Sequence, residues 1–140
     1  MKQVIPSKLK ACEMIARRIV AESQAKGYNE TDRFAVHLAL DEALSNAVRH
    51  GNRGDEAKTI TVDCSVGDDA IRLSVTDEGH GFDPRSVSDP TVDENLKRAE
   101  GRGLFLMKTY MDHVYFNAEG NCVILVKRKN SSLVAKKAAS

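Results

Sequence analysis

One stretch of predicted helix carries an acidic residue and an amide four positions apart. At 100° per residue, Glu42 and Asn46 project from the same face, and His50 follows one turn later. Ala35 and Ala39 fall on the same stripe, so small side chains leave room beside the helix for a ligand. A carboxylate next to a carboxamide oxygen suits a general base beside a ligand for Mg²⁺. The same spacing also occurs in solvated surface helices, so this interpretation needs support from elsewhere in the chain.

A second segment places an acidic residue where a strand gives way to a turn. The alternating run 70–76 predicts the strand, Asp77 follows it directly, and Gly79 and Gly81 lie in the turn. Glycines at such a point let the backbone approach a flat ligand closely. The segment therefore predicts a binding edge at the end of this strand.

A third segment places Gly101 and Gly103 just before an apolar helical pattern that runs to Met111. The first N–H groups of a helix have no partner within the helix and favour an anion such as phosphate. Each of the three segments is a modest signal by itself. Their order, spacing and predicted secondary structure are together much more specific.

The three segments resemble, in order, the N box, the Asp-x-Gly-x-Gly box and the second glycine box of the GHKL ATPase superfamily. This superfamily includes gyrase, the mismatch-repair ATPases, sensor histidine kinases and the bacterial anti-sigma-factor serine kinases. The similarity to the last group extends from about Ile5 to about Lys127. It includes an opening Ile-Pro-Ser, the phrase LALDEALSNA from Leu38 to Ala47 and the phrase GRGLFLM from Gly101 to Met107.

The resemblance implies a site for ATP and Mg²⁺. Asp77 is expected to accept a hydrogen bond from the exocyclic amine of adenine, a group that guanine replaces with a carbonyl oxygen. Asn46 is expected to coordinate Mg²⁺, and Glu42 to orient and deprotonate the attacking hydroxyl as the catalytic residue. The expected nucleotide-binding residues are Asn46, His50, Asp77, Gly79, Gly81, Gly101, Arg102, Gly103 and Leu104.

Several charged residues near the three boxes have two interpretations. Arg102 and Lys108 are candidates for phosphate contact, although a solvated Arg or Lys is the common case. His50 could line the phosphate region, or it could stand at a helix C-terminus where the dipole favours a cation. His80 and Arg49 are interpreted as ordinary surface residues.

Hydrophobic periodicity predicts the elements that position these residues. Three helices are expected: one from an N-cap at Ser7 to near Gly27, one that begins after Asn29 and runs to Gly51, and one over about residues 103–111. The predicted strands are Val4–Ile5, Thr59–Val66, Ala70–Thr76, His113–Asn117 and Cys122–Lys127. The expected fold is α+β, a two-layer sandwich in which helices cover one face of an antiparallel-dominated mixed sheet, as in the histidine-kinase-like ATPase fold.

One ATPase domain is expected over residues 1–130, because a chain of 140 residues can bury a single core. The polar stretch between Gly81 and Gly101 is long for a loop, and the resemblance implies an ATP lid there, with plain disorder as the alternative. Residues 131–140 contain too little apolar surface to pack and are expected to be a disordered tail.

Composition indicates which kinds of molecule the protein binds and where in the cell it is found. The formal net charge of +1, without a basic stripe, predicts no direct contact with nucleic acid or membrane and favours proteins as partners. Cys12, Cys64 and Cys122 are too widely spaced to indicate a disulfide framework or a zinc site, and they are expected to be small buried hydrophobes. Because neither a membrane-spanning run nor a signal-peptide pattern appears, the predicted location is the cytoplasm.

By resemblance, the expected function is that of an ATP-binding anti-sigma factor and serine protein kinase. Such a protein sequesters a sigma factor, phosphorylates a serine on an anti-anti-sigma partner and forms a homodimer. One alternative is a non-catalytic, nucleotide-dependent protein-binding module, which the intact Glu42 disfavours. The other is a detached histidine-kinase-type ATPase domain, which is disfavoured because His37 precedes Leu38 rather than an acidic residue.

Overall fold

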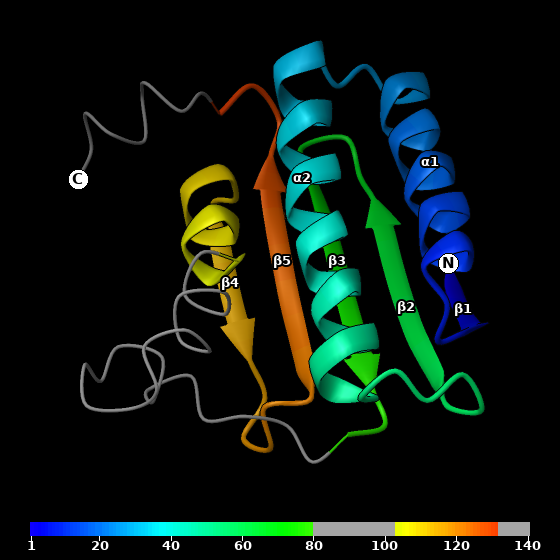
Figure 1. The fold of residues 1–140 in the computed structure, drawn as a ribbon. Coiled ribbons are helices and arrows are strands. Elements are labelled where there is room, and N and C mark those ends of the chain that lie inside the picture. Colours follow the sequence, from blue (N-terminus) through cyan, green and yellow to red (C-terminus); the bar gives the residue numbers. More distant parts are fainter. Residues whose placement is uncertain (80–102, 132–140) are drawn as a thin grey trace.

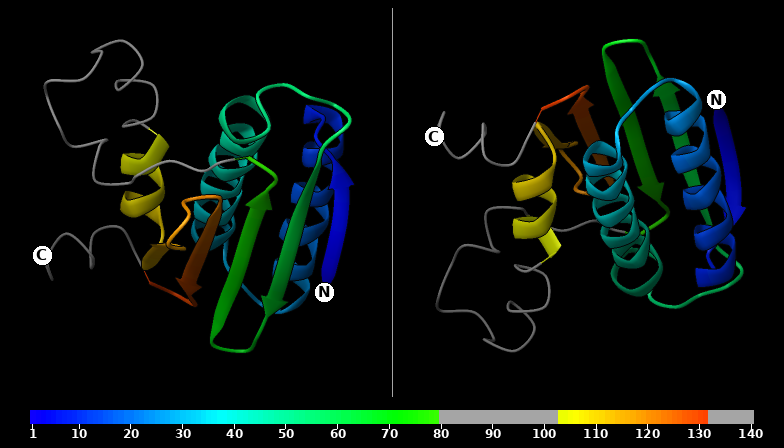
Figure 2. Two further views of the ribbon diagram at one scale, coloured as in Figure 1. Left: turned by 90° about the horizontal axis from the view of Figure 1, so that it is seen from below. Right: turned by 90° about the horizontal axis from the view of Figure 1, so that it is seen from above.

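The computed structural model describes residues 1–79 and 103–131, which form a five-stranded sheet with helices on one face (Figures 1 and 2). The strands lie in the order β1-β2-β3-β5-β4. Their bounds are β1 (Lys2–Pro6), β2 (Thr59–Val66), β3 (Ala70–Asp77), β4 (His113–Phe116) and β5 (Cys122–Arg128). The helical layer contains α1 (Leu9–Ala25), α2 (Glu30–Asn46) and a helix over residues 103–110. The predicted two-layer α+β fold is confirmed.

Every strand pairing among the described residues is antiparallel, whereas the expected sheet was mixed. The chain order explains this difference. The connection from β3 through the 103–110 helix returns the chain to β4 in the same direction as β3. However, β5 lies between β3 and β4 and pairs with both, so these two strands never form a parallel pair.

Alternation along the central strands places one face of the sheet against the helices. Val62 lies opposite Val75, and Leu73 lies opposite Leu125, so inward side chains of neighbouring strands stack in rows. The helices contribute the other half of the same core. Its fully buried members include Ile19, Val36, Leu40, Ile60, Val62, Ile71, Leu73 and Leu125, each with 0% exposure.

The helix ends differ in how well the sequence predicted them. Asn29 caps α2 as expected, because its side chain accepts a hydrogen bond from Asp32 N at 2.7 Å. The predicted N-cap at Ser7 is wrong, since α1 is capped at Lys8 without a side-chain hydrogen bond. Ser7 instead extends the strand region, with its N–H donating to Lys58 O at 3.1 Å.

The predicted second helix changes character before it ends. Regular α-helix stops at Asn46, and Ala47–Gly51 form a π-helical turn, here called η1. The N–H of Asn52 donates to Ala47 O at 2.8 Å, which closes a wider turn than an α-helix has. Gly51, at the end of this wider turn, lies against Asp77 at the end of β3.

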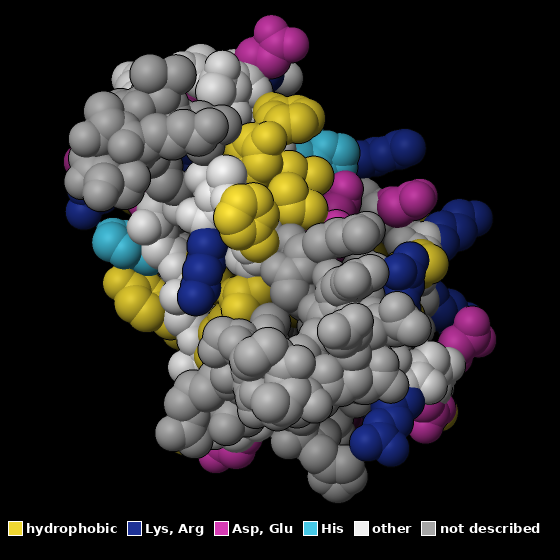
Figure 3. Space-filling view, turned by 60° about the vertical axis from the view of Figure 1, so that its left-hand side comes forward, with side chains coloured by type: hydrophobic (Ala, Val, Ile, Leu, Met, Phe, Trp, Pro, Cys, Tyr) yellow, Lys and Arg dark blue, Asp and Glu magenta, His cyan; other side chains and the backbone are white. Residues whose placement is uncertain are grey.

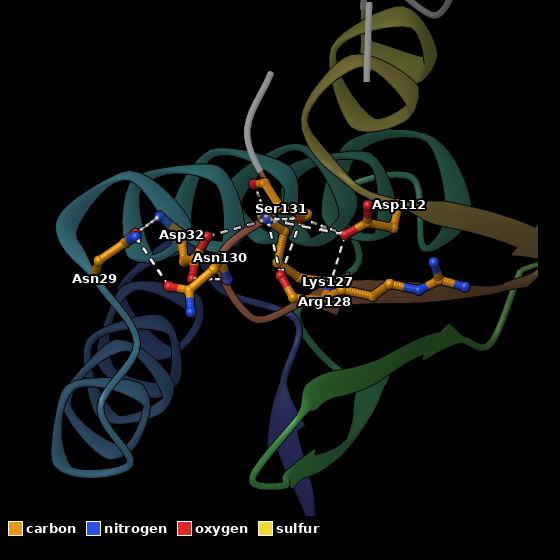
Figure 4. A network of polar contacts seen from close by, with 7 residues as sticks. All are labelled: Asn29, Asp32, Asp112, Lys127, Arg128, Asn130 and Ser131. Atoms are coloured by element: carbon orange, nitrogen blue, oxygen red, sulfur yellow. Dashed lines mark hydrogen bonds and ion pairs between the residues drawn. The ribbon is translucent and has the colours of Figure 1, made fainter. Parts of the chain in front are cut away.

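A buried ion pair lies at the opposite end of the sheet from the end of β3 (Figure 4). The side chains of Lys127 and Asp32 are 2% and 1% exposed, and Lys127 Nζ lies 3.2 Å from Asp32 Oδ1. Asp112 adds a second carboxylate 3.8 Å from the same ammonium group. Ser131 O accepts from Lys127 Nζ at 2.7 Å, and Asn130 N donates to Asp32 Oδ2 at 2.8 Å. Ordered contacts therefore extend to residue 131, and the rest of the predicted tail lies outside the described residues.

All three cysteines are free, as expected. Burial is the main cause that raises the pKa of both Cys12 and Cys64 to about 11, so these thiols stay protonated. Cys122 is only half-buried. Among the described helices, none is long and apolar enough to cross a bilayer.

Candidate nucleotide site

A cavity with a volume of about 350 Å³ opens where β3 ends and α2 passes into η1. The ends of β3 and α2 lie side by side at the bottom of Figure 1. Its polar lining comes from Asn46, Arg49, His50, Arg53, Asp77 and Asn121. Its apolar lining includes Val75, Leu104, Met107, Phe116 and Val123. A concave, partly apolar site with a few convergent polar groups suits a small organic ligand.

Asp77, the last residue of β3, is held by hydrogen bonds on both sides. Its N–H donates to Asn121 O at 2.9 Å, and Asn121 Nδ2 donates to Asp77 O at 3.2 Å. Its side-chain Oδ1 accepts from Gly79 N at 2.8 Å. The carboxylate is thereby oriented, and Oδ2 receives no hydrogen bond from the described residues.

Burial is the main influence on the charge of this carboxylate and raises the pKa of Asp77 above its ordinary value. The hydrogen bond from Gly79 and the positive charge of Lys58 lower the pKa, but by less. A half-buried acceptor whose charged form is disfavoured gains from a hydrogen-bond donor on a ligand. The exocyclic amine of adenine is such a donor.

Two glycines make room for Asp77. A Cβ on Gly51 would lie 2.2 Å from Asp77 Cγ, and a Cβ on Gly79 would lie 1.9 Å from Gly51 O. Neither distance is compatible with a side chain, so the end of η1 and the turn after β3 meet through bare backbone. Sequence analysis assigned Gly79 to the site but missed Gly51, because the contact partner lies 26 residues away in Asp77.

Glu42 and Asn46 come together near the start of the 103–110 helix. A Cβ on Gly103 would lie 2.9 Å from Glu42 Oε2 and 3.3 Å from Asn46 Nδ2. The carboxylate and the carboxamide therefore approach one point, as their four-residue spacing predicted. Asn46 also lines the cavity, whereas Glu42 is not among the lining residues.

Packing against α2 fixes the position of this helix. The rings of Phe34 and Tyr110 meet edge to face, with centroids 5.8 Å apart. Met107 and Met111 are 2% and 1% exposed and pack into the core below. Figure 3 views this side of the molecule, where hydrophobic side chains gather at the surface. Phe105, in the 103–110 helix, is 68% exposed.

The remaining predicted residues fall into three groups. His50 and Leu104 line the cavity, so the structure places them with Asn46 and Asp77. Lys108 is exposed and does not line it. Three candidates, Gly81, Gly101 and Arg102, lie outside the described residues, as do His80, which was interpreted as a surface residue, and the stretch predicted to be a lid.

Sequence analysis also missed three lining residues. Arg49 was interpreted as a surface residue, although its position one turn beyond Asn46 could have placed it at the cavity. Arg53 adopts a left-handed backbone with φ of 53°, which is uncommon outside glycine and concentrates at functional sites. Asn121 had no local signal, because only the pairing of β3 with β5 brings it beside Asp77.

The site offers oxygen ligands rather than a preformed metal centre. Within residues 1–79 and 103–131, no three His, Cys, Asp or Glu side chains gather in a way that would hold a metal ion. Asn46 and Glu42 present a carboxamide and a carboxylate near one point. This donor set fits Mg²⁺, which takes one or two protein oxygens and completes its shell with water and substrate phosphate.

Comparisons with known proteins agree with this geometry. Over 113 residues, the chain is 34% identical to the serine-protein kinase RsbW of Listeria monocytogenes, covering 75% of this chain and 71% of that protein. It is 32% identical over 99 residues to the anti-sigma F factor of Clostridium perfringens, covering 67% of this chain and 70% of that protein. Residues 5–127 match the model of the histidine kinase-like ATPase domain. The chain therefore belongs to the family of histidine kinase-like ATPase domains.

Proposed function

We propose that this protein is an ATP-binding anti-sigma factor and serine protein kinase. It sequesters a sigma factor, and with ATP it phosphorylates a serine on an anti-anti-sigma partner. The names of the two relatives, a serine-protein kinase and an anti-sigma factor, support both halves of this activity. The site retains Asp77 at one end and Glu42 with Asn46 at the other. These residues favour an active kinase over a binding module that has lost catalytic activity.

The observation that carries the proposal is the separation of two polar groups along one cavity. Asp77 stands at the end of β3 in the cavity lining, and its Oδ2, which accepts no hydrogen bond from the described residues, is the acceptor for the adenine amine. Asn46 lies farther along the lining, and Glu42 lies beside it. A nucleoside triphosphate requires one group that recognises the base and another that holds the phosphate end, and this cavity has a candidate for each.

The residues at the phosphate end divide the chemistry between them. Asn46 holds Mg²⁺ through its side-chain oxygen, and the metal supplies charge neutralisation for the phosphates. Glu42 orients the seryl hydroxyl of the protein substrate and accepts its proton as the oxygen attacks the γ-phosphorus. The bond from the γ-phosphorus to the β,γ-bridging oxygen breaks in the same step, and ADP leaves with its electron pair. Arg49 and His50 add positive charge or hydrogen-bond donors at the same wall. Gly103 keeps the space in front of Glu42 clear of a side chain.

Two accompanying proposals concern location and assembly. We place the protein in the cytoplasm, where sigma factors act, and without direct contact to nucleic acid. We also propose a homodimer, with the edge strand β1 or helix α1 as the contact surface. Val4 on β1 and Met14 on α1 support this choice, because they are 59% and 67% exposed.

The decisive test replaces Glu42 by Gln, which keeps the shape and removes the base. Affinity for ADP should change little, whereas transfer of labelled γ-phosphate from ATP to the anti-anti-sigma protein of the same organism should fall by roughly 10²–10⁴-fold. Calorimetric ADP titration and the transfer assay measure the two quantities separately.

Asp41→Asn is the matched control, because it removes the neighbouring carboxylate, which is exposed and pairs with His37 at 3.3 Å. This variant should transfer phosphate like the parent. If Glu42→Gln transfers phosphate as fast as the parent, the kinase mechanism is wrong and the nucleotide-dependent binding module is the better description.

A further inference from the structure

Asn52 is a buried amide that joins three segments of the site. It is 0% exposed and follows η1 directly. Its Nδ2 donates to Thr59 O, at the start of β2, at 3.0 Å. Its Oδ1 accepts from Glu78 N, in the turn after β3, at 2.9 Å. Both ends of the carboxamide are therefore satisfied, and no other side-chain type offers a donor and an acceptor in this short planar geometry.

The bond to Glu78 lies next to the closest backbone approach in the site. Gly51 and Gly79, the neighbours of Asn52 and Glu78, are the two glycines that meet at Asp77. The Asn52–Glu78 bond therefore holds the two segments together one residue from this contact. Glu78 reinforces the tie from the solvent side, because its carboxylate accepts from Thr59 N at 2.6 Å.

The orientation of the Asp77 carboxylate depends on this turn. Gly79 N donates to Asp77 Oδ1, so the position of the turn sets the direction of the carboxylate and leaves Oδ2 as the oxygen without a hydrogen bond from the described residues. Asn121, just before β5, forms hydrogen bonds with Asp77 only through the Asp77 backbone. It therefore does not orient the Asp77 carboxylate. A binding group must be held within roughly 10–20° of its productive orientation, so a larger tilt of the carboxylate weakens base recognition.

We propose that Asn52 is a positioning residue for purine selection: it holds the Asp77–Gly79 turn so that the Asp77 carboxylate meets the adenine amine. Asn52 does not line the cavity and acts only through Asp77. The proposal rests on the proposed function in one respect, the reading of adenine by Asp77. It adds that the selectivity of this site depends on an amide buried behind it.

The test compares ATP and GTP dissociation constants for the parent, Asn52→Ala and Tyr28→Phe by calorimetry, with thermal unfolding of each. Tyr28→Phe is the control, because it removes the hydrogen bond of another buried side chain, the 2.8 Å bond from the Tyr28 hydroxyl to Gly67 O at the far end of β3, whereas Asn52→Ala removes two such bonds. Both variants should lose stability. Only Asn52→Ala should lose preference for ATP, by roughly 5-fold or more, because it alone frees the Asp77 turn.

A purely structural role for Asn52 would lower the unfolding temperature and leave the ATP-to-GTP ratio at the parent value, which would overturn the proposal. Failure of the proposed function looks different: the parent itself would then bind ATP and GTP equally. A parent that discriminates, together with an Asp77→Asn variant that does not and an Asn52→Ala variant that does, would overturn only the role of Asn52.

A second measurement applies if Asn52→Ala does not fold. In the parent without nucleotide, hydrogen exchange at the Glu78 amide should be slow, because the buried Asn52 Oδ1 is its acceptor. Exchange at the rate of an unprotected amide would show that the turn is not held before the ligand arrives, and the proposal would fail.

Discussion

Asp32 and Asp77 lie at opposite ends of the same sheet and are surrounded in opposite ways. Asp32 is buried against the ammonium group of Lys127, 3.2 Å away, and against the N–H of Asn130. Asp77 is half-buried, and within the described parts of the chain no cation forms an ion pair with it. One carboxylate has its cation within the protein, whereas the other lines a cavity and keeps an oxygen that accepts no hydrogen bond from the described residues.

The two ends of the sheet differ in how the cost of a buried carboxylate is compensated. At the Asp32 end, burial of charge is compensated within the chain, so the network ties α2 to β5 and to the segment after it. At the Asp77 end, burial raises the pKa of the carboxyl without full compensation. A protein that keeps such a group accepts a cost in the free protein that binding a hydrogen-bond donor can relieve.

The largest effect is expected from breaking the completed network. Lys127→Met should lower the free energy of unfolding by about 3–5 kcal/mol, because it leaves the Asp32 carboxylate buried without its cation. The affinity for ADP should change little, since the network lies at the other end of the sheet. Urea denaturation measures the first quantity and calorimetric titration the second.

Arg128→Met serves as the control for this variant, because Arg128 is the next residue and is exposed. It should change stability by no more than about 0.5 kcal/mol. Adding Asp32→Asn to Lys127→Met should recover part of the loss, since the unpaired charge is then gone. Equal losses for Lys127→Met and Arg128→Met would show that the buried pair does not hold this end together.

Asp77→Asn should have the reverse effects of Lys127→Met: it should weaken ADP binding without lowering the stability of the free protein. The variant loses the charged acceptor and presents a donor to the adenine amine, so affinity for ADP should fall by roughly 5- to 150-fold. The free protein should unfold at the same or a higher temperature, because the buried charge is gone while the oxygen facing Gly79 N is kept. A loss of stability equal to that of Lys127→Met would remove the contrast between the two ends.

The smallest expected effect is a pH dependence. The folded-state pKa of Asp77 is raised above 3.8, so its unfavourable contribution to stability is present above that folded pKa and disappears as the pH falls below 3.8. The adenine amine prefers the charged carboxylate, so ADP binding lowers this pKa and releases a proton in the window where free Asp77 is partly protonated.

Calorimetry of ADP binding in two buffers of different ionisation enthalpy measures this proton release. Subtraction of the Asp77→Asn result removes the protons that belong to the nucleotide itself. If parent and variant release equal numbers of protons at every pH, Asp77 does not titrate on binding.

Local patterns predicted most of the fold correctly. Alternation gave the bounds of β2 without error and those of β3 and β5 within one residue, and Asn29 is the N-cap of α2 as expected. The inward direction of Lys127 was not foreseen, because a lysine at a strand end is usually solvated. Only the approach of Asp32 and Asp112 from other elements makes its burial possible.

For the site, the sequence alone determined which residue types stand together on one helix face and which carboxylate ends a strand, because helical and strand periodicities are local. The spacing of Glu42 and Asn46 and the place of Asp77 follow from it. Only the tertiary structure decided that Gly51 fits against Asp77, that Asn121 holds it from β5 and that Asn52 lies behind it. These contacts join segments 26 to 44 residues apart. They depend on strand register and on the widened turn at η1, which no short stretch of sequence specifies by itself.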